Sequence, residues 1–562
     1  MNEYKEGARV LRAAPFLIAL LVLVPIGIIL SSFLTPADDI WRHLVETTLA
    51  ELIFNTLLLA AGVAVGTTML GVGLAWLTAV CDFPARKFFS WALLLPLALP
   101  SYVTAFVALG ILDYTGPLQT ALRGWSGSGL AWFPQVRGAG GIIVVMNLAL
   151  YPYVYLLARS AFLTQGRRVL ESAQALGLTQ AEGFFRVALP MARPWIAAGV
   201  MLALMETLAD FGTVSVFNYD TFTTAIYKAW FGLFSLPAAS QLASLLIVVA
   251  FALLVVESRS RRRMRFAENR PGARAERIAL RGWRKWSAFA FAATVFVSGF
   301  ALPLAQLTIW ASETALLDID SRYFGFLWHS LLLGAMAALL TCVIALLLAY
   351  AKRVTHDRWT LAAVRIATIG YALPGAVLAV GVFIAFAALD NALIAFSMHF
   401  FDANPGLILQ GSLFVMLIAY VTRFLAVGYS PIDSALHRVT RNVDEAAISL
   451  GVARGSMLAR VHLPMLRGGL FTAAALVFVD VMKEMPITLM TRPFGWDTLA
   501  VRIFEMTSEG DWQRAALPAI ALVLAGLLPL IWLMRQTENA EPTRRLVAQR
   551  NAPAGLIVYA KP

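Results

Sequence analysis

Long apolar segments of bilayer length dominate this chain and decide what it can fold into. A transmembrane helix needs about 20 consecutive, mostly apolar residues, and such segments recur along all 562 residues. Charged residues make up only 14% of the chain, about half of the share in a soluble domain. We therefore expect an all-α polytopic membrane protein with about twelve transmembrane helices. These spans are expected near 13–33, 53–79, 88–111, 139–163, 192–217, 238–257, 286–311, 328–350, 362–388, 406–430, 466–490 and 515–534.

The first span resembles a signal peptide in position only. It is longer than the apolar core of such peptides, and no small-residue cleavage site follows Phe33. We expect it to remain as a membrane helix. With only Cys81 and Cys342, a disulfide-rich secreted scaffold is excluded.

Basic residues are distributed unevenly between the loops. Twelve spans place both termini on one side, and the loops of that side hold 35 of the 45 Lys and Arg residues, against 8 on the other side. Basic loops stay in the cytoplasm, so both termini are predicted to be cytoplasmic. The net charge of +12 then reflects topology and contact with anionic lipid headgroups, and we expect no nucleic-acid partner.

The chain repeats itself at an offset of 274 residues. Asn55-Thr-Leu-Leu-Leu-Ala corresponds to His329-Ser-Leu-Leu-Leu-Gly, and Leu189-Pro-Met corresponds to Leu463-Pro-Met. Each half is expected to hold six helices in the same orientation, so that the halves form parallel repeats around a central path. The predicted divisions are a first half at 1–257, a basic cytoplasmic linker at 258–285, a second half at 286–534 and a cytoplasmic tail at 535–562.

One motif occurs twice, at the same place in each half and on the predicted cytoplasmic side. Residues 171–190 contain Glu171-Ser-Ala-Gln-Ala-Leu-Gly177, nine further residues, and Val-Ala-Leu-Pro190; residues 445–464 repeat this spacing as Glu445-Ala-Ala-Ile-Ser-Leu-Gly451 and Val-His-Leu-Pro464. The glycine can end a short helix in a left-handed cap. An ordinary surface helix with such a cap is the alternative interpretation. The paired motif resembles the EAA loop of ABC-importer permeases.

That resemblance implies that each loop forms a coupling helix which docks on one of two ATP-binding-cassette ATPase subunits. The residues to which this role carries over are Glu171, Ala173, Gly177, Leu189, Pro190, Glu445, Ala446, Ala447, Gly451, Leu463 and Pro464. The chain contains no Gly-x-x-x-x-Gly-Lys-Ser/Thr sequence, which cradles nucleotide phosphates. We therefore expect a transporter subunit rather than an enzyme, with no covalently bound cofactor and with ATP hydrolysed by its partners.

Four acidic residues fall inside predicted spans, where charges are costly and usually functional. Glu206 and Asp210 are four residues apart, and so are Asp480 and Glu484, the positions that the repeat makes equivalent. Residues at this spacing share a helix face. We expect the four carboxylates to form a transient metal site on the translocation path, with Lys483 and Arg423 beside them. The alternative is that these charges pair structurally between helices.

Carboxylate oxygens suit a hard cation, and the six histidines show no metal-ligand spacing. Around the acids, Met205-Glu-Thr-Leu-Ala-Asp-Phe-Gly and Asp480-Val-Met-Lys-Glu-Met-Pro resemble the fused ferric-iron permeases of bacterial importers. The resemblance implies a type I ABC-importer fold in the bacterial cytoplasmic (inner) membrane, and a periplasmic or lipid-anchored solute-binding protein. Thiamine, polyamine and phosphonate permeases share part of these stretches and remain alternative substrate classes.

Two other classes of protein are weighed against the importer. An ion-coupled secondary transporter can also have twelve spans in two halves, but it has no need of paired EAA loops. A membrane enzyme acting on lipid would need a nucleophile and a base close together, and the sequence shows no such arrangement.

Overall fold

The protein is almost entirely helical in the computed structural model, which describes residues 2–34, 39–126, 132–262, 277–355, 357–453, 456–527 and 529. Within these residues, 10 helices are long and apolar enough to cross a membrane, or up to 11 if a bent pair is one span. The predicted all-α polytopic membrane fold is thus confirmed. The helices of the first half are α1 (Asn2–Ser31), α2 (Asp39–Thr47), α3 (Leu49–Val80), α4 (Arg86–Ala92), η2 (Leu95–Ala98), α5 (Ser101–Leu112), α6 (Pro117–Ser126), α7 (Ala139–Ala175), α8 (Gln180–Gly183), η3 (Phe184–Ala188), α9 (Leu189–Ala209), α10 (Gly212–Val216), α11 (Phe222–Tyr227), η4 (Lys228–Gly232) and α12 (Leu236–Arg262), with the short turn η1 (Ser32–Leu34) after α1.

The second half follows with a similar series of helices. Two short strands, β1 (Cys81–Asp82) and β2 (Ile278–Ala279), pair in parallel. The later helices are α13 (Trp283–Phe296), η5 (Val297–Ala301), α14 (Leu302–Asp318), α15 (Ser321–Thr355), α16 (Arg358–Ala367), η6 (Ile369–Ala372), α17 (Gly375–Phe401), α18 (Leu413–His437), α19 (Arg441–Ser449), η8 (Leu458–His462), α20 (Leu463–Lys483), α21 (Pro486–Thr491), α22 (Leu499–Ser508) and a last apolar helix, Ala516–Leu527.

Twelve straight spans are not observed. The third predicted span is a pair of segments, Arg86–Ala98 and Ser101–Ser126, bent by 93°. The bend lies at Pro100, which has no backbone N–H and keeps Leu99 before it extended. Of the twelfth predicted span, the described part contains only the short helix that ends at Leu527.

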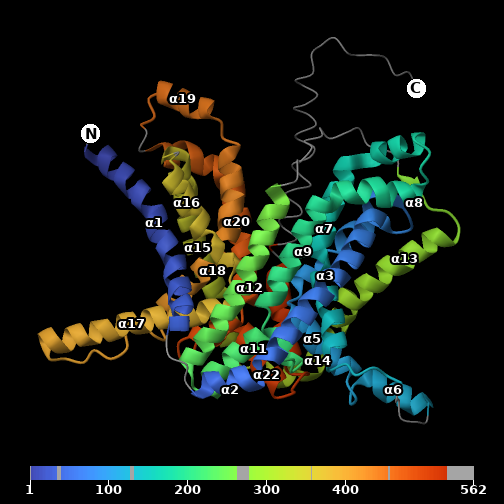
Figure 1. The fold of residues 1–562 in the computed structure, drawn as a ribbon, viewed down its shortest axis with the longest axis horizontal. Coiled ribbons are helices and arrows are strands. Elements are labelled where there is room, and N and C mark those ends of the chain that lie inside the picture. Colours follow the sequence, from blue (N-terminus) through green and yellow to red (C-terminus); the bar gives the residue numbers. More distant parts are fainter. Residues whose placement is uncertain are drawn as a thin grey trace.

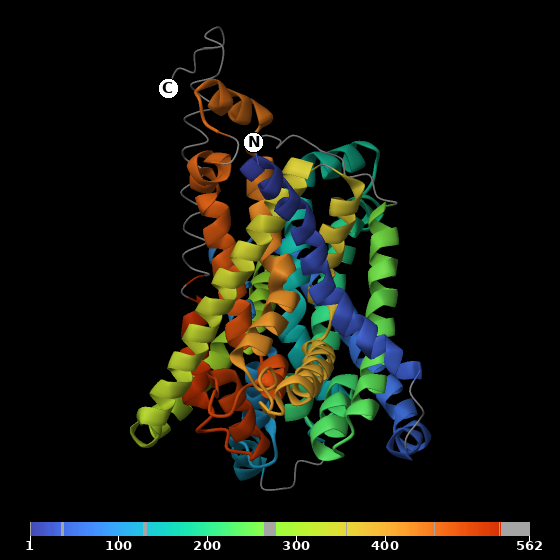
Figure 2. The ribbon, with the colours of Figure 1, turned by 90° about the vertical axis from the view of Figure 1, so that its left-hand side faces the viewer.

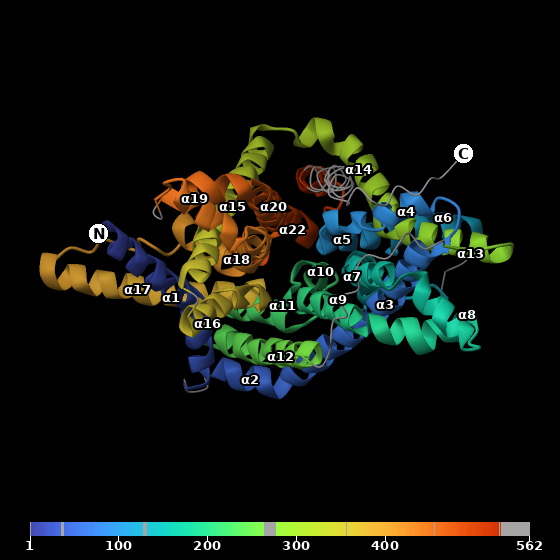
Figure 3. The same ribbon diagram turned by 90° about the horizontal axis from the view of Figure 1, so that it is seen from above.

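The offset seen in the sequence recurs in the bounds of the helices. Adding 274 to the bounds of η2 gives those of η6, and adding it to the bounds of α9 gives those of α20. Helix α7 likewise begins 274 residues before α18 and ends 274 residues before the end of α19. Viewed from above, α3, α7 and α9 lie beside the group formed by α15, α18 and α20 (Figure 3).

The first helix of each half packs against the opposite half. Helix α1 crosses α15 to α17 obliquely (Figure 2), and a Cβ on Gly381 would meet the carbonyl oxygen of Pro25 at 2.9 Å. In the other direction, α13 packs on α4 and α14 packs on α5, where a Cβ on Gly110 would meet the ring of Trp310 at 2.4 Å. This exchange ties the two sets of helices together.

The described helices give the molecule two distinct ends (Figure 1). Helix α1 begins at the end that carries α8 and α19, whereas α2, α6 and α22 lie at the other end. Helix α12 runs through to Arg262, beyond the predicted boundary at 257. Most of the predicted linker and the whole tail at 535–562 lie outside the described residues, and the division into halves stays a prediction.

Candidate translocation site

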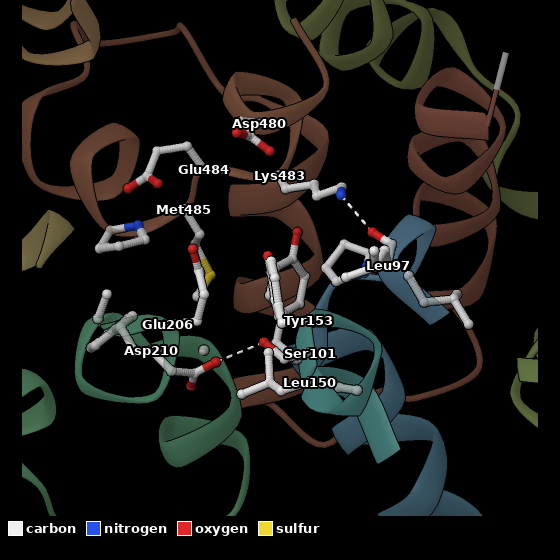
Figure 4. Close-up of a pocket in the computed structure, with 18 of the residues that line it drawn as sticks. Leu97, Ser101, Leu150, Tyr153, Glu206, Asp210, Asp480, Lys483, Glu484 and Met485 are labelled. Atoms are coloured by element: carbon white, nitrogen blue, oxygen red, sulfur yellow. Dashed lines mark hydrogen bonds between the residues drawn. The ribbon is translucent and has the colours of Figure 1, made fainter. Parts of the chain in front are cut away.

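A charged cavity of about 140 Å³ lies where the two halves meet, and all six predicted path residues line it. Its walls come from the ends of α9 and α20, from α7 and α18, from η2 and the proline-containing break after it, and from η6 (Figure 4). The lining residues that carry charge or a hydroxyl group are Ser101, Tyr102, Tyr153, Glu206, Asp210, Tyr371, Arg423, Asp480, Lys483 and Glu484.

The second acid of each pair stands at a helix break. Helix α9 ends at Ala209 and α20 ends at Lys483, so the predicted continuous spans 192–217 and 466–490 are wrong. Asp210 accepts hydrogen bonds from the backbone N–H and the hydroxyl of Thr213, both at 2.8 Å, and Glu484 accepts one from the N–H of Ile487 at 3.2 Å. Both carboxylates thus cap the short helix that follows them, which needs acceptors for its first N–H groups.

The neighbours of these two capping acids differ between the halves. Ser101 donates to Asp210 at 2.6 Å. The residue 274 positions later is Gly375, where a Cβ would lie 2.6 Å from an oxygen of Glu484. This glycine leaves room for Arg423, whose guanidinium lies 3.3 Å from Glu484 and donates to the carbonyl of Leu373 at 2.8 Å.

The first acid of each pair, Glu206 or Asp480, accepts no side-chain hydrogen bond from the described residues of its own half. Glu206 accepts a hydrogen bond from the Tyr371 hydroxyl at 2.7 Å, and that tyrosine belongs to η6 of the second half. The carboxylate of Asp480 has no hydrogen bond within the described residues. The four carboxylates therefore divide into two helix caps and two acids that face the cavity.

Lys483 forms the second contact between the halves at this level. Its ammonium donates to the backbone carbonyl of Leu97 in η2 at 2.7 Å (Figure 4). The residue 274 positions before it is Ala209, so the first half has no equivalent cation. Lys483 and Arg423 both line the cavity together with the four acids, and their role on a translocation path stays a prediction.

Three tyrosines complete the wall, and the sequence alone does not single them out. Tyr102 is 6% exposed, and its hydroxyl has no hydrogen-bond partner among the described residues. Tyr153 and Tyr371 both lie within electrostatic reach of Glu206 and Asp480. The available signal was the repeated Ala-Leu-Pro at Pro100 and Pro374, which marks the helix breaks beside which Tyr102 and Tyr371 lie.

The structure does not gather the acids into a ready metal site. Within the described residues, no group of three or more His, Cys, Asp or Glu side chains is arranged to hold a metal ion. The reason is the helix breaks, which commit Asp210 and Glu484 to backbone N–H groups. Cation binding by all four carboxylates together stays a prediction, and in this conformation it would require them to move.

Both predicted coupling loops end in the expected glycine cap. Gly177 and Gly451 have φ of +85° and +83°. The N–H groups of Leu178 and Val452 reach back to the carbonyls of Ala173 and Ala447, at 3.1 and 2.9 Å, as in a Schellman cap. The left-handed caps are thus confirmed. Leu189-Pro190 and Leu463-Pro464 open α9 and α20, where a proline at the first turn sacrifices no helical hydrogen bond.

The loops differ in how they leave the preceding helix. In the first half α7 continues unbroken to Ala175, so the expected separate short helix is not seen there, whereas α18 stops at His437 and α19 stands apart. Arg353 accounts for the stop, because it donates to the carbonyls of Leu436 and Val439 at 2.9 and 2.8 Å. The corresponding first-half residue is Ala79.

A charged node anchors α19 to the body of the second half. Asp444 accepts hydrogen bonds from Arg353 and from the buried His462, both at 2.7 Å. Burial alone raises the pKa of the Asp444 carboxyl, but the hydrogen bonds and charges of His462 and Arg353 outweigh it and lower the pKa below its ordinary value. Leu170 and Ala188 occupy the equivalent first-half positions, so the first loop has no such anchor.

Each loop also exposes a large apolar side chain. Leu176 is 84% exposed and Leu450 is 85% exposed, one residue before each glycine cap. No described residue of the chain covers either leucine, and the role of the two loops in docking another protein stays a prediction.

Comparison with known proteins bears on this arrangement. Residues 68–265 match the family described as the binding-protein-dependent transport system inner membrane component. This part of the chain is therefore similar to the binding-protein-dependent transport permeases. This family works in general with an ATPase and a solute-binding protein, and it is a family of multi-pass inner-membrane proteins.

Relatives of this permease extend along most of the chain. The Fe(3+)-transport system permease protein FbpB 2 of Haemophilus influenzae is 26% identical over 87% of this chain and 90% of its own length. The ferric transport system permease protein FbpB of Actinobacillus pleuropneumoniae is 22% identical over 89% of this chain and 73% of its own. A putative 2-aminoethylphosphonate permease, PhnV of Salmonella typhimurium, is 28% identical but covers 43% of this chain.

Proposed function

We propose that this protein is the membrane subunit of an ABC importer that carries ferric iron across the bacterial inner membrane. The observation that carries the proposal is the cavity between the halves. Four carboxylates and two cationic side chains line it, so its formal charge is negative if all six are ionised. A buried excess of negative charge requires a positive partner.

The charge and the size of the cavity favour a metal cation over the other substrate classes. The four carboxylates of the lining would repel the phosphonate group of a phosphonate substrate. The volume of about 140 Å³ is below the roughly 300–1,000 Å³ of clefts that hold drug-sized ligands, which is small for thiamine. The unpartnered hydroxyl of Tyr102 and the two cavity-facing acids offer only oxygen, which suits a hard ion.

The two coupling loops support docking of two ATPase subunits on one face. Exposed Leu176 and Leu450 stand at equivalent places, and we assign that face to the cytoplasm because its loops are the basic ones. A periplasmic or lipid-anchored binding protein would then deliver iron at the end that carries α2, α6 and α22 (Figure 1). ATP hydrolysis is assigned to the partner subunits, and this chain supplies the path.

The decisive experiment is transport by the complete complex in proteoliposomes, loaded with radiolabelled ferric iron on its binding protein. We expect ATP-dependent uptake that excess thiamine or putrescine leaves unchanged. Uptake of either organic cation in place of iron would overturn the assignment of cargo, and iron uptake without ATP would overturn the importer class.

A further inference from the structure

The lysine of the cavity has a second role suggested by its contacts. Lys483 lies at the end of α20, yet within the described part of the chain its ammonium donates only to the carbonyl of Leu97, 386 residues away in the other half. No carboxylate oxygen of the described residues lies within 4.0 Å of its ammonium. The charges that act on it most are those of Asp480 and Glu206, the two acids that do not cap a helix.

Arg423, the other cation of the cavity, has no hydrogen bond to the opposite half among the described residues. Arg423 is held within its own half, by Glu484 and by the carbonyl of Leu373, and it is 7% exposed. A lysine ammonium sits on a flexible four-carbon stem and is a point charge. Lys483 is therefore the cavity cation that can leave its position when another positive charge arrives.

We propose that Lys483 is a tethered counter-ion that offsets one of the two negative charges of Glu206 and Asp480 in the empty cavity and, through the Leu97 carbonyl, latches the two halves together. A cargo cation that binds between these two acids repels the ammonium and takes over its electrostatic role. The Lys483–Leu97 hydrogen bond then breaks, so that arrival of cargo and release of the halves become one event. The inference rests on the proposed function only in requiring that the cargo be a cation.

The hydrogen bond between Tyr371 and Glu206 also joins the halves in the cavity, and cargo binding would weaken it too. The Tyr371 hydroxyl of the second half donates to Glu206 of the first. A cation that draws on the oxygens of Glu206 competes with this donor as well. Two hydrogen bonds of the described residues thus join the halves in the cavity, and both depend on the acids to which the cargo binds. One is accepted by Glu206 itself, and the other is donated by Lys483, whose ammonium is attracted by Glu206 and Asp480.

The repeat explains why one such latch is enough. The first half has Ala209 where the second has Lys483, so a single ammonium serves both acids. Two lysines would balance all the free negative charge and leave no electrostatic advantage for cargo. With one, Glu206 and Asp480 together keep one negative charge in excess.

The test uses the full complex with ATPase and binding protein in nanodiscs, and measures ATP hydrolysis without cargo. For Lys483→Met, which keeps the stem and removes the charge, we expect at least a threefold rise in this cargo-free rate. Lys483→Arg, which retains the charge and the donor, should stay within twofold of the wild type. Lys228→Met is the matched control, because Lys228 pairs with Asp220 at 2.6 Å on a half-exposed surface outside the cavity, and its rate should not change.

A second measurement reports the latch directly. Spin labels at Lys87→Cys in α4 and Arg358→Cys in α16, both exposed, follow the distance between the halves, with Cys81 and Cys342 replaced by alanine. Lys483→Met should broaden the distance distribution of the cargo-free complex toward that of the cargo-loaded wild type. A cargo-free hydrolysis rate and a distance distribution both equal to those of the wild type would overturn the latch.

These outcomes are separable from failure of the proposed function. If the wild type transports a different cation, the cargo-free measurements keep their meaning. If Lys483→Met loses transport while its cargo-free hydrolysis and its distance distribution both stay at the wild-type level, the lysine affects only the electrostatics of the path and the latch is wrong. The melting temperature of each purified complex identifies variants that fail to assemble. If Lys483→Met is one of them, Lys483→Gln, which also removes the charge, is measured in its place.

Discussion

At the scale of residues, equivalent positions in the sequence have different tasks in the structure. The pairs Glu206 and Asp210, and Asp480 and Glu484, look alike on a helical wheel. Because both helices stop at the second acid, Asp210 and Glu484 cap α10 and α21, while Glu206 and Asp480 keep their oxygens for the cavity.

This division predicts separable effects of neutralising the acids. Glu206→Gln and Asp480→Asn should each lower iron uptake about tenfold while leaving the melting temperature of the complex nearly unchanged, because neither removes a helix cap. Asp210→Ala, which removes a cap, and Glu484→Gln, which removes a charge, should instead lower that temperature. Loss of a cap costs about 0.5–2 kcal/mol, and loss of the Glu484 charge leaves the buried guanidinium of Arg423 without its paired carboxylate, at about 3–5 kcal/mol.

Uptake and thermal unfolding measured on the same preparations distinguish the two groups. Full iron uptake by a stable Glu206→Gln/Asp480→Asn double variant would exclude these acids from the path. A fall in melting temperature for the double variant as large as that for Glu484→Gln would favour structural pairing of all four.

At the scale of elements, the caps of the coupling loops give a direct test of their role. Nothing lies within 4 Å of a Cβ added at Gly177 or Gly451, but their positive φ penalises a side chain by about 1–2 kcal/mol. Gly177→Val and Gly451→Val should therefore change the path of the loop without disturbing the core. We expect ATP hydrolysis to continue while iron transport falls severalfold, measured as the ratio of iron carried to ATP used. An unchanged ratio in both single variants and in the double variant would count against docking at these loops.

The anchor of α19 gives an element-scale prediction with a pH dependence. Asp444→Asn removes a charge from two hydrogen bonds, each worth about 1.5–3 kcal/mol to a charged group, so the amide hydrogens of α19 should exchange at least tenfold faster. Because the folded pKa of Asp444 is below its ordinary value, the anchor is intact at neutral pH and is lost only as the pH falls below about 4. The variant and the wild type should converge there.

Hydrogen exchange followed by mass spectrometry makes this comparison peptide by peptide. Glu445→Gln, on an exposed position of the same helix, is the control and should leave the exchange of α19 unchanged. Equal exchange of α19 in Asp444→Asn and the wild type at pH 7 would show that Arg353 and His462 do not hold it.

The sequence predicts the elements of this fold better than their interruptions. Hydropathy and the 274-residue offset place nearly every long helix, because burial in lipid demands a long apolar run. The ends of α9 and α20 are not visible in hydropathy, since α10 and α21 continue the apolar pattern after the break. Tyr102 and Tyr371 were missed for a related reason: tyrosine is common in apolar segments, and only the bends at Pro100 and Pro374 bring these two into the cavity.

At the scale of the whole molecule, exchange of the first helices binds the halves around the cavity. Helix α1 lies on α15 to α17 and α14 lies on α5, so neither half can rotate away freely. Movement between the halves is therefore expected to be concentrated at the cavity, where two hydrogen bonds join them. The direction of that movement across the membrane depends on which end of the molecule faces the cytoplasm.

The orientation can be tested with single cysteines and a membrane-impermeant maleimide. Cysteines at Ser126 in α6 and Ser508 in α22 should be labelled in spheroplasts, because these helices lie at the end predicted to face outward. A cysteine at Ser449, exposed in α19, should be labelled only after the membrane is permeabilised. The native Cys81 and Cys342 are both buried and should contribute little background. Labelling of Ser449→Cys in intact spheroplasts would show that the predicted topology is inverted. Both glycine-capped loops would then face away from any cytoplasmic ATPase, and the basis for ATP-driven import would be lost.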